Sequence, residues 1–166
     1  MIITLIGMPG CGKSCMGRAL SSKLKLKNID GDKLIEKTVG KKLHDIISEC
    51  GLEEFRRIEE EVLLTINGDD IIISPGGSAV YYESVMEHFK KIGKVVYLYV
   101  GLDNLKARLG DYSKRGIVMR PDQTLEDLFL ERCALFEKYA DITINCDGNS
   151  YAKYQRELIA RLQSEA

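Results

Sequence analysis

The chain has 166 residues, of which 45% are hydrophobic and 30% charged, as expected for one compact globular domain. Its formal net charge of −1 supplies no overall attraction to nucleic acid or to an anionic membrane, so a bound anion must be held by a local cluster of charge. Five cysteines without paired spacing argue against a disulfide framework or zinc site, and an N-terminus without a basic leader or long apolar run argues against a signal peptide or membrane span. We therefore expect a cytoplasmic protein.

Short β-branched apolar runs alternate with longer helical patterns along the chain. Continuous apolar runs are typical of buried parallel strands, and the alternation predicts an α/β fold in which a parallel five-stranded sheet carries helices on both faces. Sites in such folds lie beyond the carboxyl ends of the strands. The predicted strands cover 2–6, a short run ending near 29–30, 71–74, 94–100 and 141–146, and the predicted helices cover 14–26, 32–39, 43–49, 52–66, 82–91, 103–109, 124–139 and 151–163.

A phosphate-binding loop follows the first predicted strand and opens a helix. Gly7-Met8-Pro9-Gly10-Cys11-Gly12-Lys13-Ser14 matches G-x-x-x-x-G-K-[ST] at every fixed position. Glycines let backbone N–H groups approach phosphate oxygens, and the helix adds the positive end of its dipole. Lys13 places a charge on the β- and γ-phosphates, and the Ser14 hydroxyl can ligate Mg²⁺. The alternative, an ordinary glycine-rich turn, fits these flanks and fixed positions less well.

Candidate site residues follow two further predicted strands. Asp32, in Asp30-Gly31-Asp32, can organise Mg²⁺ or accept a proton from an attacking hydroxyl, and its alternative role is to cap the helix that follows. Gly76 and Gly77 end another strand, where they allow a ligand to approach the backbone closely. The alternative there is a plain turn.

Arginines on two predicted helices are candidate ligands for a carboxylate. Arg56 and Arg57 lie off the apolar face of their helix, and Arg132 lies on a later helix. Arginine suits bidentate carboxylate recognition. Because Glu60 and Glu61 follow four residues after Arg56 and Arg57, a salt-bridged solvated face is the alternative interpretation.

A polar stretch at 112–123 has little helical periodicity and contains Lys114, Arg115 and Arg120. This composition predicts a mobile lid that brings an arginine onto the transferring phosphate. A basic surface loop is the alternative.

Taken in order, these motifs resemble the shikimate kinases, a branch of the nucleoside-monophosphate-kinase-like P-loop proteins. The ordered set is GMPGCGKS, DGD, GLEEFRRIEE, PGGSAV, a lid with Arg-Pro, and then R-x-x-x-x-x-x-Y, and it covers almost the whole chain. The resemblance implies a single P-loop NTPase-type kinase domain over 1–166. A small helical substrate-binding insertion is expected at about 32–62 and the lid at about 111–123.

For the nucleotide, the resemblance implies ATP as co-substrate with Mg²⁺ held by Ser14 and Asp32. Arg108 matches the arginine that packs on adenine in this family, and Arg120 matches the lid arginine that bridges ATP and acceptor. The residues expected to bind ATP are Gly10, Cys11, Gly12, Lys13, Ser14, Cys15, Arg108 and Arg120.

For the acceptor, the resemblance implies conversion of shikimate and ATP to shikimate 3-phosphate and ADP, one step in aromatic amino-acid biosynthesis. Arg56 and Arg132 would grip the substrate carboxylate, and Gly76 and Gly77 would lie against the ring. Asp32 would touch a substrate hydroxyl. We expect a monomer whose partner is this small molecule, with no nucleic acid or membrane partner. The expected catalytic residues are Lys13, Asp32 and Arg120.

Two departures from the family pattern leave other functions open. Ser78 stands in the family's glycine triplet, where its side chain is expected to crowd the ring or to require altered backbone angles. Asp122 follows the lid arginine where the family usually has apolar residues. The alternatives are a related kinase acting on gluconate, a nucleoside monophosphate or another hydroxy acid, and a non-catalytic nucleotide-binding module that switches a protein partner.

Overall fold

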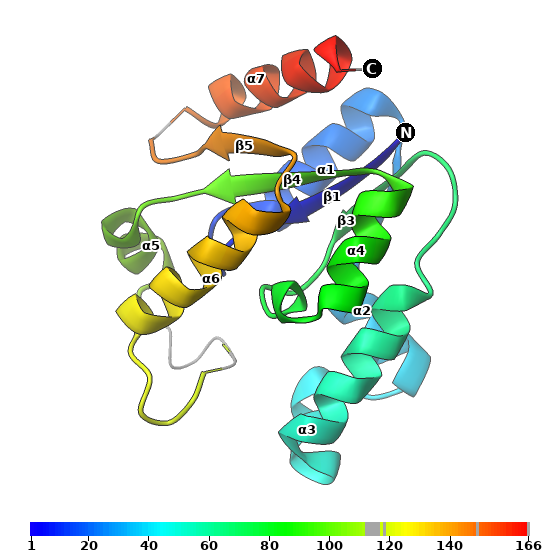
Figure 1. Ribbon diagram of the computed structural model, residues 1–166, viewed down its shortest axis with the longest axis vertical. Helices are drawn as coiled ribbons and strands as arrows, with labels where there is room; N and C mark the ends of the chain where they lie inside the picture. The colour runs from blue at the N-terminus through cyan, green and yellow to red at the C-terminus, as the bar shows by residue number, and fades with distance from the viewer. Residues whose placement is uncertain (112–116, 118, 149, 166) are drawn as a thin grey trace.

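The computed structural model describes residues 1–111, 117, 119–148 and 150–165 (Figure 1). Strands and helices alternate along the chain, as the apolar runs predict. In chain order the elements are β1 (Ile2–Ile6), α1 (Lys13–Leu24), β2 (Lys27–Asp30), α2 (Gly31–Val39), α3 (Leu43–Leu64), β3 (Ile71–Ser74), the 3₁₀ helix η1 (Ala79–Tyr81), α4 (Glu83–Ile92), β4 (Lys94–Tyr99), α5 (Leu102–Leu109), α6 (Leu125–Tyr139), β5 (Ile142–Asn145) and α7 (Tyr151–Ser164).

The strands form a five-stranded parallel sheet in the order β2-β3-β1-β4-β5. In β1, the central strand, Ile3 pairs with Ile72 of β3, and Thr4 pairs with Val95 of β4. Helices α1 and α7 cover one face of the sheet, and α4 and α6 cover the other (Figure 1). Burial of β1, β3 and β4 on both faces explains their continuous apolar sequences. The predicted fold class is therefore confirmed.

Helices α2 and α3 pack on each other and project from the sheet as a separate lobe (Figure 1). A small apolar cluster holds the lobe together, with Ile35 of α2 against Ile46, Phe55 and Val62 of α3. Helix α3 is kinked at Gly51, whose φ of 83° lies in the left-handed region that favours glycine. The kink falls between the two helices predicted at 43–49 and 52–66.

The carboxyl ends of β1, β2 and β3 meet at one edge of the sheet, beside the α2–α3 lobe (Figure 1). The phosphate-binding loop follows β1, Asp32 follows β2, and Gly76 follows β3. This arrangement brings the predicted sites together, because parallel strands end on the same side. No helix among the described residues is long and apolar enough to cross a membrane.

The predicted lid at 111–123 is described only at 111, 117 and 119–123. Lys114 and Arg115 lie outside the described residues. Arg120 is described, and its surroundings are given below with the site.

Candidate active site

The phosphate-binding loop curls around the side chain that it supplies. Gly10 and Gly12 adopt φ values of 82° and 100°, which an L-residue with a side chain rarely adopts. Lys13, the first residue of α1, donates from Nζ to the backbone oxygens of Gly7 (2.7 Å) and Met8 (3.0 Å). The ammonium group is therefore held by the loop that is predicted to bind phosphate.

A cavity of about 780 Å³ extends from this loop to the α2–α3 lobe. Its wall includes side chains from the loop, from both helices of the lobe, from the segment after β3, and from α6. Cys11 is buried, with its Sγ 3.7 Å from Lys13 Nζ, and it is not part of the wall. The predicted site residues that line the cavity are Gly10, Gly12, Lys13, Ser14, Cys15, Asp32, Gly76, Gly77 and Arg132.

Asp30, the last residue of β2, and Asp32 both line the cavity, and Asp30 has a second role. Asp30 caps α2, because its side chain accepts a hydrogen bond from the Lys33 backbone N–H at 3.1 Å. Asp32 lies in the first turn of α2 and lines the cavity, so the capping role considered for Asp32 belongs to Asp30. Burial, and next the charge of Asp30, raise the pKa of the Asp32 carboxyl, while the charge of Lys13 opposes the rise.

The paired glycines after β3 leave room for charged side chains. A Cβ atom on Gly77 would lie 2.9 Å from Nη1 of Arg132, and one on Gly76 would lie 3.1 Å from Oδ1 of Asp32. Both distances are shorter than ordinary van der Waals contact. The glycines therefore allow a guanidinium group and a carboxylate to pack against the backbone inside the cavity.

Arg132 projects into the cavity from α6 and is only 1% exposed. Its Nε donates to Oη of Tyr81 at 3.4 Å, and its Cζ lies 5.4 Å from the centre of the Tyr81 ring. Arginine is the cation best suited to pairing with a carboxylate. This position therefore suits the recognition of an organic acid.

Glu59 is a cavity residue that sequence reasoning missed. It is 2% exposed, and it accepts hydrogen bonds from Tyr82 Oη at 2.7 Å and Ser78 Oγ at 3.1 Å. Burial raises the pKa of Glu59, and the two hydroxyls oppose the rise. A signal was present in the sequence, since Glu59 lies four residues after Phe55 and three before Val62 and so falls on the buried face of the helix.

Ser78 does not require unusual backbone angles. Its φ and ψ are −82° and −10°, and its hydroxyl donates to Glu59. The expected altered backbone is therefore wrong, because an ordinary right-handed conformation suffices for any residue at this position.

Comparisons with known proteins give the family. The sequence model for shikimate kinase matches residues 9–163. The chain belongs to the shikimate kinase family. A shikimate kinase of Sulfurihydrogenibium sp. (strain YO3AOP1) is 33% identical, with 97% of each chain covered, and one of Mycobacterium leprae (strain TN) is 34% identical, with 97% of this chain and 82% of the relative covered.

Solved structures agree with this assignment. A shikimate kinase from Acinetobacter baumannii, in complex with shikimate, superposes with a TM-score of 0.86 at 28% identity and covers 99% of this chain and 93% of its own. The P-loop NTPase-type fold and the kinase class predicted from the sequence are confirmed at the level of family. As a member of this family the chain is an ATP-dependent phosphotransferase, and the family favours shikimate over gluconate or a nucleoside monophosphate.

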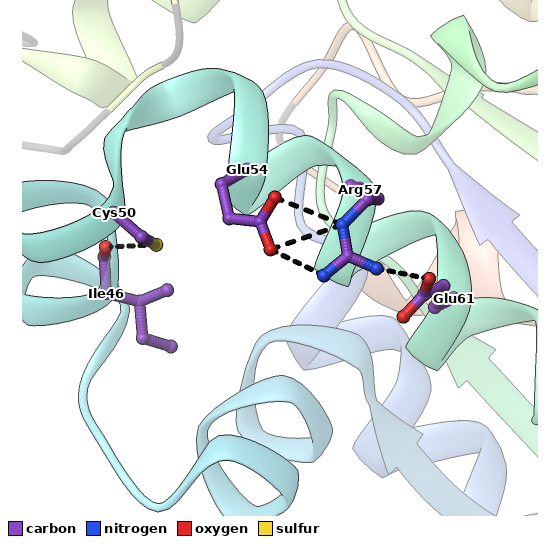
Figure 2. Close-up of polar contacts among 5 residues, drawn as sticks. All are labelled: Ile46, Cys50, Glu54, Arg57 and Glu61. Carbon is purple, nitrogen blue, oxygen red and sulfur yellow. Dashed lines mark hydrogen bonds and ion pairs between the residues drawn. The ribbon is translucent and has the colours of Figure 1, made fainter.

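The adjacent arginines of α3 differ in their surroundings. Arg57 is bound on the helix surface by Glu54 and Glu61, as Figure 2 shows, so the salt-bridge interpretation is confirmed for Arg57. Arg56 is exposed and is not part of the cavity wall, and Glu60 accepts a hydrogen bond from Ser84. The clamp of Arg56 and Arg132 on one carboxylate stays a prediction, with Arg132 alone in the wall.

Two further arginines assigned to ATP lie outside the cavity wall. Arg108 of α5 donates from Nη2 to the Cys146 backbone oxygen at 3.0 Å, next to β5. Arg120 is exposed, and its Nη2 lies 3.6 Å from Oε2 of Glu131 on α6. Asp122, beside it, is also exposed. The roles of Arg108 and Arg120 in binding ATP stay predictions.

Proposed function

We propose that this chain transfers the γ-phosphoryl group of ATP to a hydroxyl of shikimate, giving shikimate 3-phosphate and ADP. One observation supports this proposal most directly. A single cavity contains the Lys13 ammonium, the Asp32 carboxylate and the buried Arg132 guanidinium. These are the groups needed to hold a triphosphate, orient a hydroxyl and bind an organic acid.

On the nucleotide side, Lys13 offsets the negative charge of the β- and γ-phosphates. The loop's backbone N–H groups and the N-terminus of α1 provide further positive potential. Lys13 must then exchange its loop carbonyl partners for phosphate oxygens. Binding ATP therefore changes the hydrogen bonds of a residue that is already positioned.

On the acceptor side, Asp32 orients the substrate hydroxyl and accepts its proton. Burial raises the pKa of Asp32, which makes this carboxylate a stronger base than an exposed aspartate. Because Asp32 packs against Gly76 in the cavity wall, a hydroxyl bound there approaches the carboxylate directly. Asp32 is therefore assigned the role of catalytic base.

Arg132 provides recognition of the acceptor carboxylate. A neutral polyol in the same place forms no ion pair with the guanidinium group, which disfavours such acceptors. Arg56, exposed at the edge of the lobe, is assigned to the same carboxylate once acceptor is bound. The resting arrangement thus has one arginine in place and one still to move.

The residues present also suit a magnesium ion. Mg²⁺ is usually bound by one or two carboxylate or hydroxyl ligands together with phosphates and waters. Ser14, Asp30 and Asp32 line one cavity and offer this set of oxygens. When bound, the ion supplies charge neutralisation on the phosphates, and Ser14 and Asp32 are the residues assigned to hold it.

The remaining assignments complete the proposal. Arg120 leaves Glu131 to bridge ATP and acceptor, and Arg108 packs on adenine. The enzyme acts as a cytoplasmic monomer on a small-molecule substrate. These assignments are supported by the family membership of the chain.

The proposal is tested by mixing the protein with ATP, Mg²⁺ and shikimate and detecting shikimate 3-phosphate directly. ADP release is measured in parallel with gluconate, nucleoside monophosphates and the methyl ester of shikimate. We expect strong stimulation by shikimate and weak stimulation by the ester, which lacks the charge that Arg132 recognises. Strong stimulation by another acceptor and none by shikimate contradicts the proposal. Tight ATP binding without any acceptor-dependent turnover would instead favour the non-catalytic module.

A further inference from the structure

Tyr81, at the end of η1, contacts Arg132, which lines the cavity. Tyr81 is 39% exposed, whereas Arg132 is only 1% exposed. The Arg132 Cζ lies 5.4 Å from the ring centre, within the range of a cation–π contact. The hydrogen bond from Nε to Tyr81 Oη is long at 3.4 Å, so the ring contact is the stronger part of the interaction.

A second contact of the guanidinium comes from the same short segment. Nη1 of Arg132 packs against Gly77, where a Cβ atom would approach it to 2.9 Å. The guanidinium therefore lies in a slot formed by the Gly77 backbone and the Tyr81 ring. One segment of the chain thus supplies both contacts in the slot that receives a side chain from α6.

This segment is rigid enough to define the slot. The backbone N–H groups of Ala79, Tyr81 and Tyr82 donate to the oxygens of Gly76, Ser78 and Ala79, respectively, and form the turn of η1. Ala79 and Val80 are buried in the main core, which fixes the turn to the rest of the domain. The position of the Tyr81 ring follows from these neighbours.

We propose that Tyr81 is a positioning residue for acceptor recognition, which holds the Arg132 guanidinium in its slot with one edge toward the cavity. The inference rests on the proposed function, because it assigns to Arg132 the acceptor carboxylate. An arginine held in one orientation before binding loses less side-chain entropy when the acid arrives. Tyr81 thereby raises acceptor affinity without touching the reacting atoms.

The groups that face Tyr81 keep its hydroxyl neutral. Burial raises the pKa of Tyr81, Arg132 opposes the rise, and Glu131 adds to it. The contact with Arg132 therefore persists through the neutral pH range. Acceptor recognition by Arg132 should accordingly show no titration that is due to Tyr81 between pH 6 and pH 9. The upper limit of this range lies roughly one unit below the ordinary tyrosine pKa of about 10.

The test compares Tyr81→Leu, which keeps apolar bulk but has no aromatic face, with Tyr81→Phe, which keeps the face and loses the hydroxyl. Leu130→Ala is the control, because Leu130 is an exposed apolar residue of the same helix as Arg132. We expect Tyr81→Leu to raise the KM for shikimate about tenfold with kcat and the KM for ATP nearly unchanged, and Tyr81→Phe to change it by about twofold or less. Equal rises in both KM values, or no rise for shikimate, would overturn the proposal.

A second measurement does not depend on activity. The Nε–H proton of Arg132 is followed by NMR in the protein without substrates, and we expect faster exchange with water in Tyr81→Leu than in wild type or Tyr81→Phe. Unchanged exchange in Tyr81→Leu overturns the positioning role. Wild-type protein without shikimate-dependent turnover contradicts the proposed function, and the exchange measurement then still decides whether Tyr81 holds Arg132.

Discussion

The two halves of the cavity are built in different ways. The nucleotide side, residues 7–15, is one continuous segment whose shape comes from left-handed glycines and from a lysine bound to its own loop. The acceptor side consists of Asp32, Glu59, Gly76, Gly77 and Arg132, which come from α2, α3, the segment after β3, and α6. Recognition is local on the first side, whereas on the second it depends on how separate elements pack.

This difference predicts how each half fails. A change in the nucleotide side should act through one charge or one backbone angle. A change in the acceptor side should act through the contacts between elements. Substitutions of two neighbouring residues there can therefore have very different effects on acceptor binding. The predictions below test this contrast, from the largest expected effect to the smallest.

Replacing Lys13 with alanine should have the largest effect. It removes the charge assigned to the β- and γ-phosphates, and we expect kcat/KM to fall by about 10²–10³-fold or more, as for other groups that stabilise developing charge. Steady-state ADP release at saturating shikimate measures the loss. Lys23→Ala, an exposed lysine in the last turn of the same helix, is the matched control and should behave as wild type.

The adjacent pair Arg56 and Arg57 tests whether exposed residues of α3 join the acceptor side. Arg56→Ala should cost about 2–5 kcal/mol of binding free energy for shikimate, so the KM for shikimate should rise roughly 30-fold or more. The KM for ATP should stay unchanged. Arg57→Ala should leave both unchanged, because Arg57 is held by Glu54 and Glu61 on the helix surface (Figure 2). Indistinguishable acceptor kinetics for the two variants would remove Arg56 from the site.

Alanine substitutions at Gly77 and at Gly12 should distinguish the acceptor side, which depends on packing between elements, from the nucleotide side, which depends on local backbone angles. Gly77→Ala brings a Cβ to 2.9 Å from Arg132 Nη1, so it should displace the guanidinium and raise the KM for shikimate about tenfold, on the order of 1.4 kcal/mol. Gly12 has nothing within 4 Å of its hypothetical Cβ, but its φ is 100°. Gly12→Ala should therefore act through backbone strain of about 1 kcal/mol and weaken ATP binding instead.

Isothermal titration with each ligand distinguishes these outcomes. A loss of shikimate affinity in Gly12→Ala with ATP affinity unchanged would contradict the local construction of the nucleotide side. A loss of ATP affinity in Gly77→Ala with shikimate affinity unchanged would contradict the packed construction of the acceptor side.

Glu59→Gln should have the smallest effect, a gain in stability whose size depends on pH. The folded-state pKa of Glu59 is raised, so the wild-type carboxyl binds its proton more tightly when folded, and its ionisation destabilises the fold as pH rises above the ordinary value of about 4.3. Glutamine does not ionise. We therefore expect Glu59→Gln to raise Tm by about 2–4 °C at pH 7, with the gain vanishing below about pH 4.

Thermal denaturation from pH 4 to pH 8 measures this dependence, together with acceptor kinetics at pH 7. Higher stability combined with weaker shikimate turnover would indicate that the buried charge is retained for function. An equal gain in Tm at every pH would mean that ionisation of Glu59 is not its cause.

Much of the fold could be predicted from the sequence because its signals are local. The continuous apolar runs 2–6 and 71–74 are buried strands, and Gly51 divides the two predicted helices at a kink within α3. The phosphate-binding motif lies in its expected place between β1 and α1. These features depend on side-chain periodicity and backbone angles, which neighbouring residues determine.

The acceptor side was less accessible to sequence reasoning. Asp30 and Asp32 are equivalent in a motif and both line the cavity, and only the start of α2 gives Asp30 the additional role of helix cap. Arg56 and Arg57 are likewise adjacent and chemically identical, but Glu54 and Glu61 bind Arg57, whereas Glu60, four residues after Arg56, accepts a hydrogen bond from Ser84 of α4. Glu59 appeared as one of several glutamates until its burial was known.

The sequence by itself determined the family, the parallel α/β sheet and the loop that binds phosphate, because each follows from residues close together in the chain. Only the tertiary structure decided that Tyr81 contacts Arg132 and that Ser78 and Tyr82 hold Glu59. These contacts join residues that are 19 or more positions apart. Their formation depends on how helices pack at the edge of a sheet, and no local pattern encodes that geometry.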